Sequence, residues 1–293
     1  MKRLIILILL VILTFSAMGC GRQPAADTDK TIVYTTIYPL YFMAKEIGGD
    51  RIDVTNIIPA GVSVHEWEPG TRDIANLSKA DLIIYLGMDL DSWILKTQSS
   101  SSQAVYYEAS KNIKPIEEGN TVNPHIWLSP KNALIMADNI KEALISVDES
   151  NGEYFEQNYK MLAQRLSELD KRYSETLSNV SKKSFVVYHK AFSYLARDYG
   201  LEEISVIGLN DEQEPSLAQI SRVIDYCKAN DIKYIFTEPL VTPKPMQTIA
   251  DETGAQILTL NPLGGLTEEE EKNGEDYISI MQENLKNLQK ALE

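Results

Sequence analysis

Apolar and polar positions along the chain alternate between strand-like and helix-like segments from Thr31 onwards. Short β-branched or apolar runs predict strands, and longer segments with an apolar residue every three or four positions predict helices. In the first half, strands are expected at Thr31–Ile37, Asp53–Ile58, Asp81–Leu86 and Ala104–Tyr107. Helices are expected at Tyr41–Ile47, at Thr71–Lys79, and from the capping pair Ser129-Pro130 to about Val147.

A second series of the same kind begins near Ser184. Its expected strands are Ser184–Tyr188, Ile204–Ile207, Tyr234–Phe236 and Ile257–Leu260. Its expected helices are Ala191–Tyr199, Leu217–Ala229, Pro245–Thr253 and Asp276–Leu292. Strands that alternate with helices are typical of parallel sheets with crossover helices. The sequence therefore predicts two α/β lobes, at residues 31–150 and 182–293.

The segment between the lobes, residues 151–181, contains no proline, and its only glycine is Gly152. Its apolar residues form one stripe at helical spacing: Phe155, Tyr159, Leu162, Leu166, Leu169, Tyr173, Leu177 and Val180. At 1.5 Å per residue, about thirty residues make a rod of roughly 45 Å. A coiled-coil dimer is an alternative, but the stripe spans barely four heptads. We expect one long rigid helix packed along both lobes of a monomer.

The N-terminal residues resemble an export signal. Lys2 and Arg3 precede an uninterrupted apolar run from Leu4 to Phe15, which predicts a signal peptide over residues 1–19. Ala17-Met18-Gly19-Cys20 resembles a bacterial lipobox, in which Cys20 becomes the lipidated first residue. Ordinary cleavage that leaves Cys20 as a free thiol is the alternative. Residues 20–30 then form the lipidated Cys and a polar tether, so the protein is expected on the outer face of the cytoplasmic membrane or in the periplasm.

The chain is strongly acidic, with 42 Asp and Glu against 28 Lys and Arg. Loss of residues 1–19 removes two basic residues, which changes the net charge from −14 to −16. An acidic surface argues against a nucleic-acid partner, which is a polyanion. Only Cys227 remains besides Cys20, so the chain has no disulfide framework.

The chain has three histidines, and each lies where strand-like sequence gives way to a loop or helix. His65 follows Asp53–Ile58, His125 precedes Ser129-Pro130, and His189 ends the strand at Tyr188. In open α/β sheets, ligands bind beyond the carboxyl ends of strands, so these positions can converge on a cleft between the lobes. Imidazoles suit zinc, and three histidines with a carboxylate or water are a normal zinc arrangement. Each histidine taken alone is more often structural, but the set predicts one metal site.

Several motifs resemble the substrate-binding lipoproteins (cluster A-I) of bacterial zinc and manganese ABC importers. They are Val64-His65-Glu66-Trp67-Glu68-Pro69, Asn123-Pro124-His125-Ile126-Trp127, Tyr188-His189-Lys190-Ala191-Phe192, Phe236-Thr237-Glu238-Pro239 and Leu260-Asn261-Pro262-Leu263. The resemblance covers nearly the whole mature chain. It implies that His65, His125 and His189 bind the metal. A histidine at the third position resembles the zinc-type members, whereas manganese-type members carry glutamate there.

The chain departs from the family pattern in two places. The histidine-rich loop of many zinc-type relatives is missing, because Lys111–Val122 is short and contains no histidine. Relatives also supply a fourth ligand, Asp or Glu, near residues 261–265, where this chain has Asn261 and Gly264. The fourth ligand is then a water, the Asn261 oxygen or a carboxylate of Glu268–Glu271. Water is preferred, and the acidic run is expected to be a solvated loop.

The expected function is extracytoplasmic capture of Zn²⁺ and delivery to an ABC permease, with Mn²⁺ as the alternative metal and no enzymatic activity. One rival is a zinc-dependent hydrolase, because three histidines and a water also describe a catalytic site. No HExxH motif is present, and Glu66 is the only general-base candidate beside a histidine. The other rival is a lipid-anchored adhesin that uses the same cleft. Glu238 is a candidate acceptor for an imidazole N–H, and Trp67 and Trp127 are expected to report on the site.

Overall fold

The computed structural model describes residues 30–65, 67–98, 103–211, 213–239 and 244–293. The signal peptide, Cys20 and the tether up to residue 29 lie outside the described residues, as does Glu66. Among the helices of the described part, none is both long and apolar enough to cross a membrane. Residues 31–293 form one compact unit.

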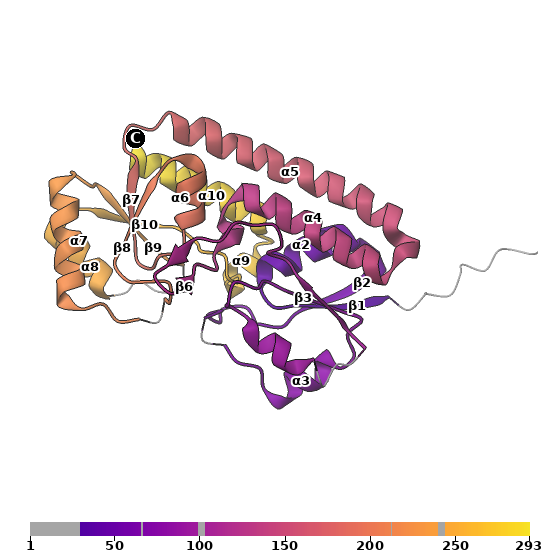
Figure 1. Cartoon of the computed structure of the whole chain (residues 1–293). Helices are drawn as coiled ribbons and strands as arrows, with labels where there is room; N and C mark the ends of the chain where they lie inside the picture. The colour runs from indigo at the N-terminus through magenta and orange to yellow at the C-terminus, as the bar shows by residue number, and fades with distance from the viewer. Residues whose placement is uncertain (1–29, 66, 99–102, 212, 240–243) are drawn as a thin grey trace, which may run out of the picture. The chain divides into compact units, whose positions relative to one another are not determined.

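The first lobe is built on a four-stranded parallel sheet with strand order β2-β1-β3-β4. The strands are β1 (Thr31–Thr35), β2 (Ile52–Asn56), β3 (Leu82–Tyr85) and β4 (Val105–Glu108). Its helices are α2 (Tyr38–Gly48), α3 (Thr71–Leu77) and α4 (Pro130–Val147). Figure 1 shows α2 and α4 on one face of this sheet and α3 on the other, so apolar strands such as Leu82–Tyr85 are covered on both sides.

The second lobe has a four-stranded parallel sheet with strand order β10-β9-β7-β8. The strands are β7 (Ser184–Val187), β8 (Glu202–Ser205), β9 (Tyr234–Thr237) and β10 (Gln256–Thr259). Its helices are α6 (Ser193–Tyr199), α7 (Leu217–Ala229), α8 (Lys244–Thr253) and α10 (Tyr277–Leu292). In both sheets the first strand of the lobe is an inner strand, with the second strand on one side of it and the third and fourth on the other. The prediction of two α/β lobes with parallel sheets is confirmed.

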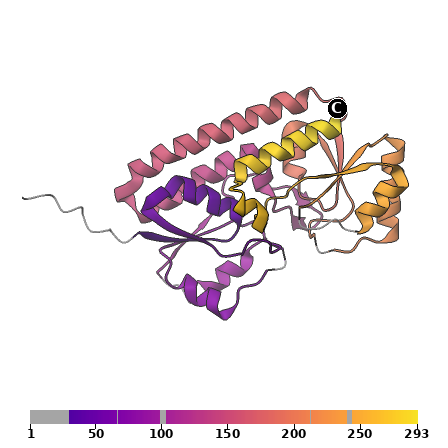
Figure 2. The ribbon, with the colours of Figure 1, turned by 180° about the vertical axis from the view of Figure 1, so that it is seen from behind.

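The long helix α5 runs from Gly152 to Ser178, slightly shorter than the expected 151–181. Asn151 belongs to a preceding 3-10 turn, and the chain leaves the helix at Asn179. Within the helix the apolar stripe is buried at six positions, which are Phe155, Leu162, Leu166, Leu169, Tyr173 and Leu177, and Val180 just beyond the helix is buried as well. This stripe packs on α2 and α4 of the first lobe and on α6 and α10 of the second. Figures 1 and 2 show α5 lying along both lobes. Its apolar face therefore packs on its own lobes, as predicted, and is not used for a coiled coil with a second chain.

Two local expectations were wrong, and one element was not expected. Helix α2 begins at Tyr38 and includes Pro39 in its first turn, where proline's missing N–H costs nothing. The segment before His125, for which no element was predicted, contains a small antiparallel hairpin, Glu117–Glu118 with Thr121–Val122. The acidic run expected as a loop is helix α9 (Glu268–Lys272), which begins with a capping box made by Thr267 and Glu270.

Candidate metal centre

The three histidines line one cavity of about 390 Å³ between the two lobes. His65 lies on the segment between β2 and α3, and His125 precedes the 3-10 turn Ile126–Leu128 that leads into α4. His189 lies two residues beyond the end of β7. The first lobe therefore contributes two imidazoles and the second lobe one. His125 follows the small hairpin rather than a strand of the main sheet, so the strand-exit expectation holds for it only loosely.

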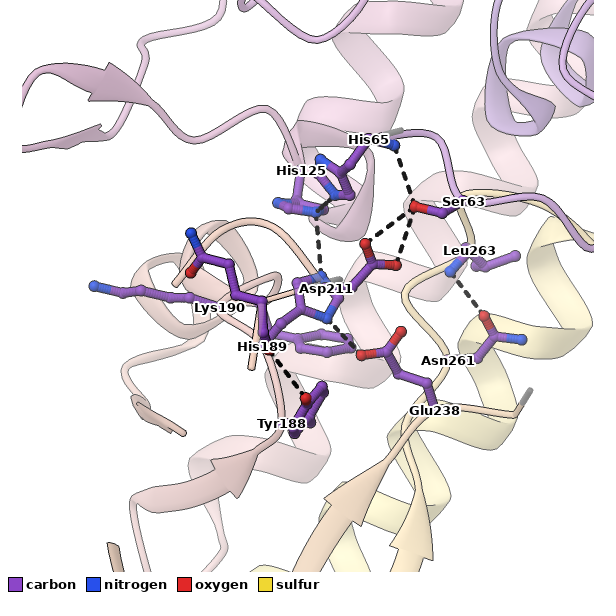
Figure 3. A network of polar contacts seen from close by, with 12 residues as sticks. Ser63, His65, His125, Tyr188, His189, Lys190, Asp211, Glu238, Asn261 and Leu263 are labelled. Atoms are coloured by element: carbon purple, nitrogen blue, oxygen red, sulfur yellow. Dashed lines mark hydrogen bonds and ion pairs between the residues drawn. The ribbon is translucent and has the colours of Figure 1, made fainter. Parts of the chain in front are cut away.

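The Nε2 atoms of the three histidines converge. Nε2 of His125 is 3.0 Å from Nε2 of His65 and 3.4 Å from Nε2 of His189. One nitrogen from each ring lies within 4.8 Å of the other two, the only group of this kind among the described residues (Figure 3). Two ligands of a tetrahedral zinc ion at about 2.0–2.1 Å are roughly 3.4 Å apart. The spacing is therefore close to that of three imidazoles around one ion.

Asn123 orients the ring of His125. Its Oδ1 accepts hydrogen bonds from the backbone N–H and from Nδ1 of His125, both at 3.0 Å. Because an amide oxygen can only accept, Nδ1 carries the proton and Nε2 keeps its lone pair. The ring is 1% exposed, so its orientation is held by packing as well as by the hydrogen bond. The sequence motif Asn123-Pro124-His125 thus supplies both a candidate ligand and the residue that orients its ring.

Glu238, just beyond β9, orients His189 in the same way. Its Oε1 lies 2.5 Å from Nδ1 of His189, so Nδ1–H donates to the carboxylate and Nε2 faces the other histidines (Figure 3). A carboxylate that accepts from the far nitrogen of an imidazole fixes its tautomer and makes the metal-facing nitrogen more basic. This is the contact expected of Glu238 from the sequence.

The surroundings shift the pKa values of the two buried imidazoles in opposite directions. Burial lowers the pKa of His125 well below its usual value, and the neighbouring His189 and His65 lower it further. Burial also acts to lower the pKa of His189, but the hydrogen bond and negative charge of Glu238 outweigh it, and the net pKa is raised. His189 is therefore the stronger base of the two and binds a proton at higher pH than His125 does.

Substitution of Glu238 by glutamine tests this contact. Glu238→Gln keeps a hydrogen-bond acceptor but removes the charge that makes Nε2 of His189 basic, so zinc affinity should fall about tenfold. Affinity is measured by competition with a chelator at pH 7.5. Glu118→Gln is the matched control, because Glu118 pairs with Nζ of Lys190 at 2.8 Å and contacts no imidazole in the described contacts. Equal losses in the two variants would contradict a specific role for Glu238.

The two tryptophans that follow ligand candidates lie in different surroundings. The Trp127 ring is fully buried, stands 5.2 Å from the ring of His125, and donates from Nε1 to the carbonyl of Pro262 at 2.8 Å. Trp67 packs instead against Trp93, with ring centroids 5.0 Å apart, and does not line the cavity. Of the two expected reporters, the structure puts Trp127 beside the site.

Zinc is therefore expected to change the tryptophan fluorescence of the protein through Trp127. Trp127→Phe should lose most of the zinc-induced change, whereas Trp93→Phe should retain it, since Trp93 contacts no histidine among the described ring pairs. The measurement is emission during a zinc titration of each folded variant, with folding checked by circular dichroism. An unchanged spectrum of the unsubstituted protein at saturating zinc would count against the placement of His125.

Two of the residues considered for a fourth ligand, Asn261 and Glu270, are held in other contacts. Oδ1 of Asn261 accepts from the backbone N–H of Leu263 at 2.7 Å, and its Nδ2 donates to Oε1 of Glu270 at 2.8 Å. Oε2 of Glu270 accepts the N–H of Thr267, which starts α9. Gly264 lines the cavity without a side chain. These contacts connect residues within the segment 261–270, and none of them is made to a histidine.

Asp211 also lines the cavity and was missed by the sequence analysis. It lies between β8 and α7, and both of its carboxylate oxygens accept from Oγ of Ser63, at 3.0 and 3.2 Å (Figure 3). The sequence did contain a signal for Asp211, namely its position after a predicted strand. It follows Ile204–Ile207 just as His189 follows Ser184–Tyr188.

The chain matches known zinc-uptake proteins over most of its length. Residues 33–291 match the family model described as ZnuA, zinc-uptake complex component A, periplasmic. The high-affinity zinc uptake system protein ZnuA of Bacillus subtilis is 37% identical over 296 residues, covering 94% of this chain and 93% of that protein. The zinc-binding lipoprotein AdcA of Streptococcus pneumoniae is 35% identical, and there the chain spans only 58% of the relative's length.

Solved structures agree with these matches. The Zn(II)-bound ZnuA-like domain of Streptococcus pneumoniae AdcA has a TM-score of 0.81 and 36% identity, covering 90% of this chain and 99% of that domain. The laminin-binding protein Lmb of Streptococcus agalactiae has a TM-score of 0.84 and 33% identity, covering 90% of this chain and all of that one. Lmb is described as a bifunctional protein with adhesin and metal-transporting activity.

Proposed function

The chain belongs to the ZnuA family of periplasmic zinc-uptake components, and from this membership we propose that it captures Zn²⁺ outside the cytoplasmic membrane and delivers it to an ABC-type import permease. The observation that carries the proposal is the convergence of the three Nε2 atoms in a cavity between two lobes. A cavity that opens between lobes lets an ion enter and leave, which a delivery protein needs and a closed structural zinc site does not.

His65, His125 and His189 are proposed as the metal ligands. Asn123 and Glu238 fix the tautomers of two of them, so their lone pairs face the ion before it binds. Imidazole nitrogens suit zinc, whereas manganese is favoured by carboxylate, carbonyl and water oxygens. A set of three imidazoles therefore supports Zn²⁺ as the cargo and Mn²⁺ as the weaker competitor.

A transport role is proposed in preference to catalysis. A zinc hydrolase needs a general base within hydrogen-bond reach of the bound water. Two acidic residues line the described cavity, and both are engaged. Oε1 of Glu238 is bound to Nδ1 of His189, on the side of the ring away from the other imidazoles. Both carboxylate oxygens of Asp211 accept from Oγ of Ser63. Glu66, the base considered from the sequence, lies outside the described residues. The family's description as an uptake component supports the same choice.

The remaining parts of the proposal concern the anchor and the domain limits. Residues 1–19 act as a signal peptide, and lipidated Cys20 with a tether to residue 30 holds the protein at the membrane. The lobes comprise residues 31–150 and 182–293, with 151–181 as the link that includes α5. The protein works as a monomer, because the apolar stripe of α5 is already used by packing on its own lobes.

Metal competition tests the proposal. The purified mature protein is expected to bind one Zn²⁺ and to retain it in a hundredfold excess of Mn²⁺. Zinc delivery is tested by growth in zinc-depleted medium of a bacterium that lacks its own zinc-uptake binding protein. Growth should be restored by the full chain and not by His125→Ala. Displacement of zinc by manganese, or hydrolytic turnover that depends on His189, would overturn the proposal.

A further inference from the structure

The carboxylate of Asp211 enters the cavity from the second lobe, opposite the two histidines of the first lobe. Asp211 is half-buried and follows β8, while Ser63 and His65 lie on the segment after β2 of the first lobe. In Figure 3 the carboxylate lies between the Ser63 hydroxyl and the imidazoles, and the three residues line the same cavity. The contact between Ser63 and Asp211 therefore joins the two lobes at the edge of the histidine cluster.

Three imidazoles leave a zinc ion with an open coordination position and its full charge of +2. A fourth protein ligand with a negative charge would complete the tetrahedron and halve that charge. Among the described residues that line the cavity, the acidic ones are Asp211 and Glu238. Glu238 is taken by the far nitrogen of His189, so Asp211 is the remaining carboxylate of the cavity. It lies outside the group of three nitrogens within 4.8 Å of one another, so it has to approach them when the ion binds.

We propose that Asp211 is the fourth zinc ligand, a role that rests on the proposed function of the histidines as the other three. One oxygen binds the ion while the other keeps the hydrogen bond from Oγ of Ser63. Carboxylates that bind metals are commonly held by such a second hydrogen bond. Oγ of Ser63 also accepts from the backbone N–H of His65 at 3.3 Å, so the same hydroxyl connects a carboxylate of one lobe to a histidine segment of the other.

The assignment divides the proposed ligands equally between the lobes. With His65 and His125 on one lobe and His189 and Asp211 on the other, zinc binding draws the lobes together through two ligands from each.

Two substitutions separate a ligand from a hydrogen-bond partner. Asp211→Asn removes the anionic ligand, and Ser63→Ala removes the hydroxyl while leaving the carboxylate. Zinc affinity is measured by chelator competition on the full mature chain, and the visible absorption of bound Co²⁺ reports the coordination. Asp211→Asn should weaken zinc binding about a hundredfold and change the Co²⁺ spectrum. Ser63→Ala should weaken it about tenfold and leave the spectrum nearly unchanged.

The outcomes distinguish this inference from the function on which it rests. If Asp211→Asn matches Ser63→Ala in affinity and leaves the Co²⁺ spectrum unaltered, Asp211 is only a partner of Ser63 and the assignment is overturned. In that case the proposed function still stands if His125→Ala loses zinc binding. If the unsubstituted protein binds no zinc, both fail together. Unfolding temperatures of the metal-free variants establish that Asp211→Asn is folded.

Discussion

Zinc binding should weaken by at least about a hundredfold in His125→Ala. A structural zinc site with four ligands is worth about 10–16 kcal/mol, so one ligand contributes roughly 3 kcal/mol, which is about a hundredfold in affinity. Substitution of His125 should cause at least this loss of affinity. Its Nε2 is the one that approaches both of the others, at 3.0 and 3.4 Å, and Asn123 already holds it in the binding tautomer.

Chelator competition at pH 7.5 measures this effect. Tyr188→Phe is the matched control, because Tyr188 lines the same cavity and its hydroxyl donates to the carbonyl of Gln213 at 3.2 Å. Its zinc affinity should stay within about twofold of the unsubstituted protein, since no ligand nitrogen is removed. A His125→Ala protein that is folded and binds zinc as well as the control would rule out the three-histidine site.

Lowering the pH from 7.5 to 5.0 should weaken zinc binding on the order of a hundredfold. Zinc needs the neutral imidazole, so each proton that binds a ligand competes with the ion, at about tenfold per pH unit below that ligand's pKa. The pKa of His189 is raised, so its competition begins earliest as the pH falls. The pKa of His125 is lowered well below its usual value, so that ring stays neutral and adds little to the loss.

Glu238→Gln supplies the internal control for this pH dependence. Without the carboxylate, the burial of His189 is no longer outweighed by Glu238, so the pKa of His189 falls. The decline in zinc affinity should then begin at lower pH, although affinity at pH 7.5 is weaker. Affinity is measured at steps of half a pH unit with a chelator of known proton affinity. A flat profile in the unsubstituted protein, or an onset unmoved by Glu238→Gln, would contradict this account.

Much of the fold could be predicted because its signals are local. The burial pattern of α5 follows from the three-and-four spacing of Phe155 to Leu177, and α4 begins where Ser129 caps it before Pro130. The element boundaries that were predicted wrongly depend on residues that are compatible with more than one local structure. Thr267 and Glu270 form a capping box that turns an acidic run into α9, and Pro39 reads equally well as a strand end or a helix start.

Residue identity and periodicity were enough to predict the three histidines as a metal site and the order of elements that brings them together, because these signals need no knowledge of distant contacts. Which atoms meet depends on the packing of the whole chain. Nε2 of His125 and Nε2 of His189 come from residues 64 positions apart, and Ser63 and Asp211 from residues 148 apart. Side-chain direction at such separations is set by how the lobes pack, and no local pattern encodes it.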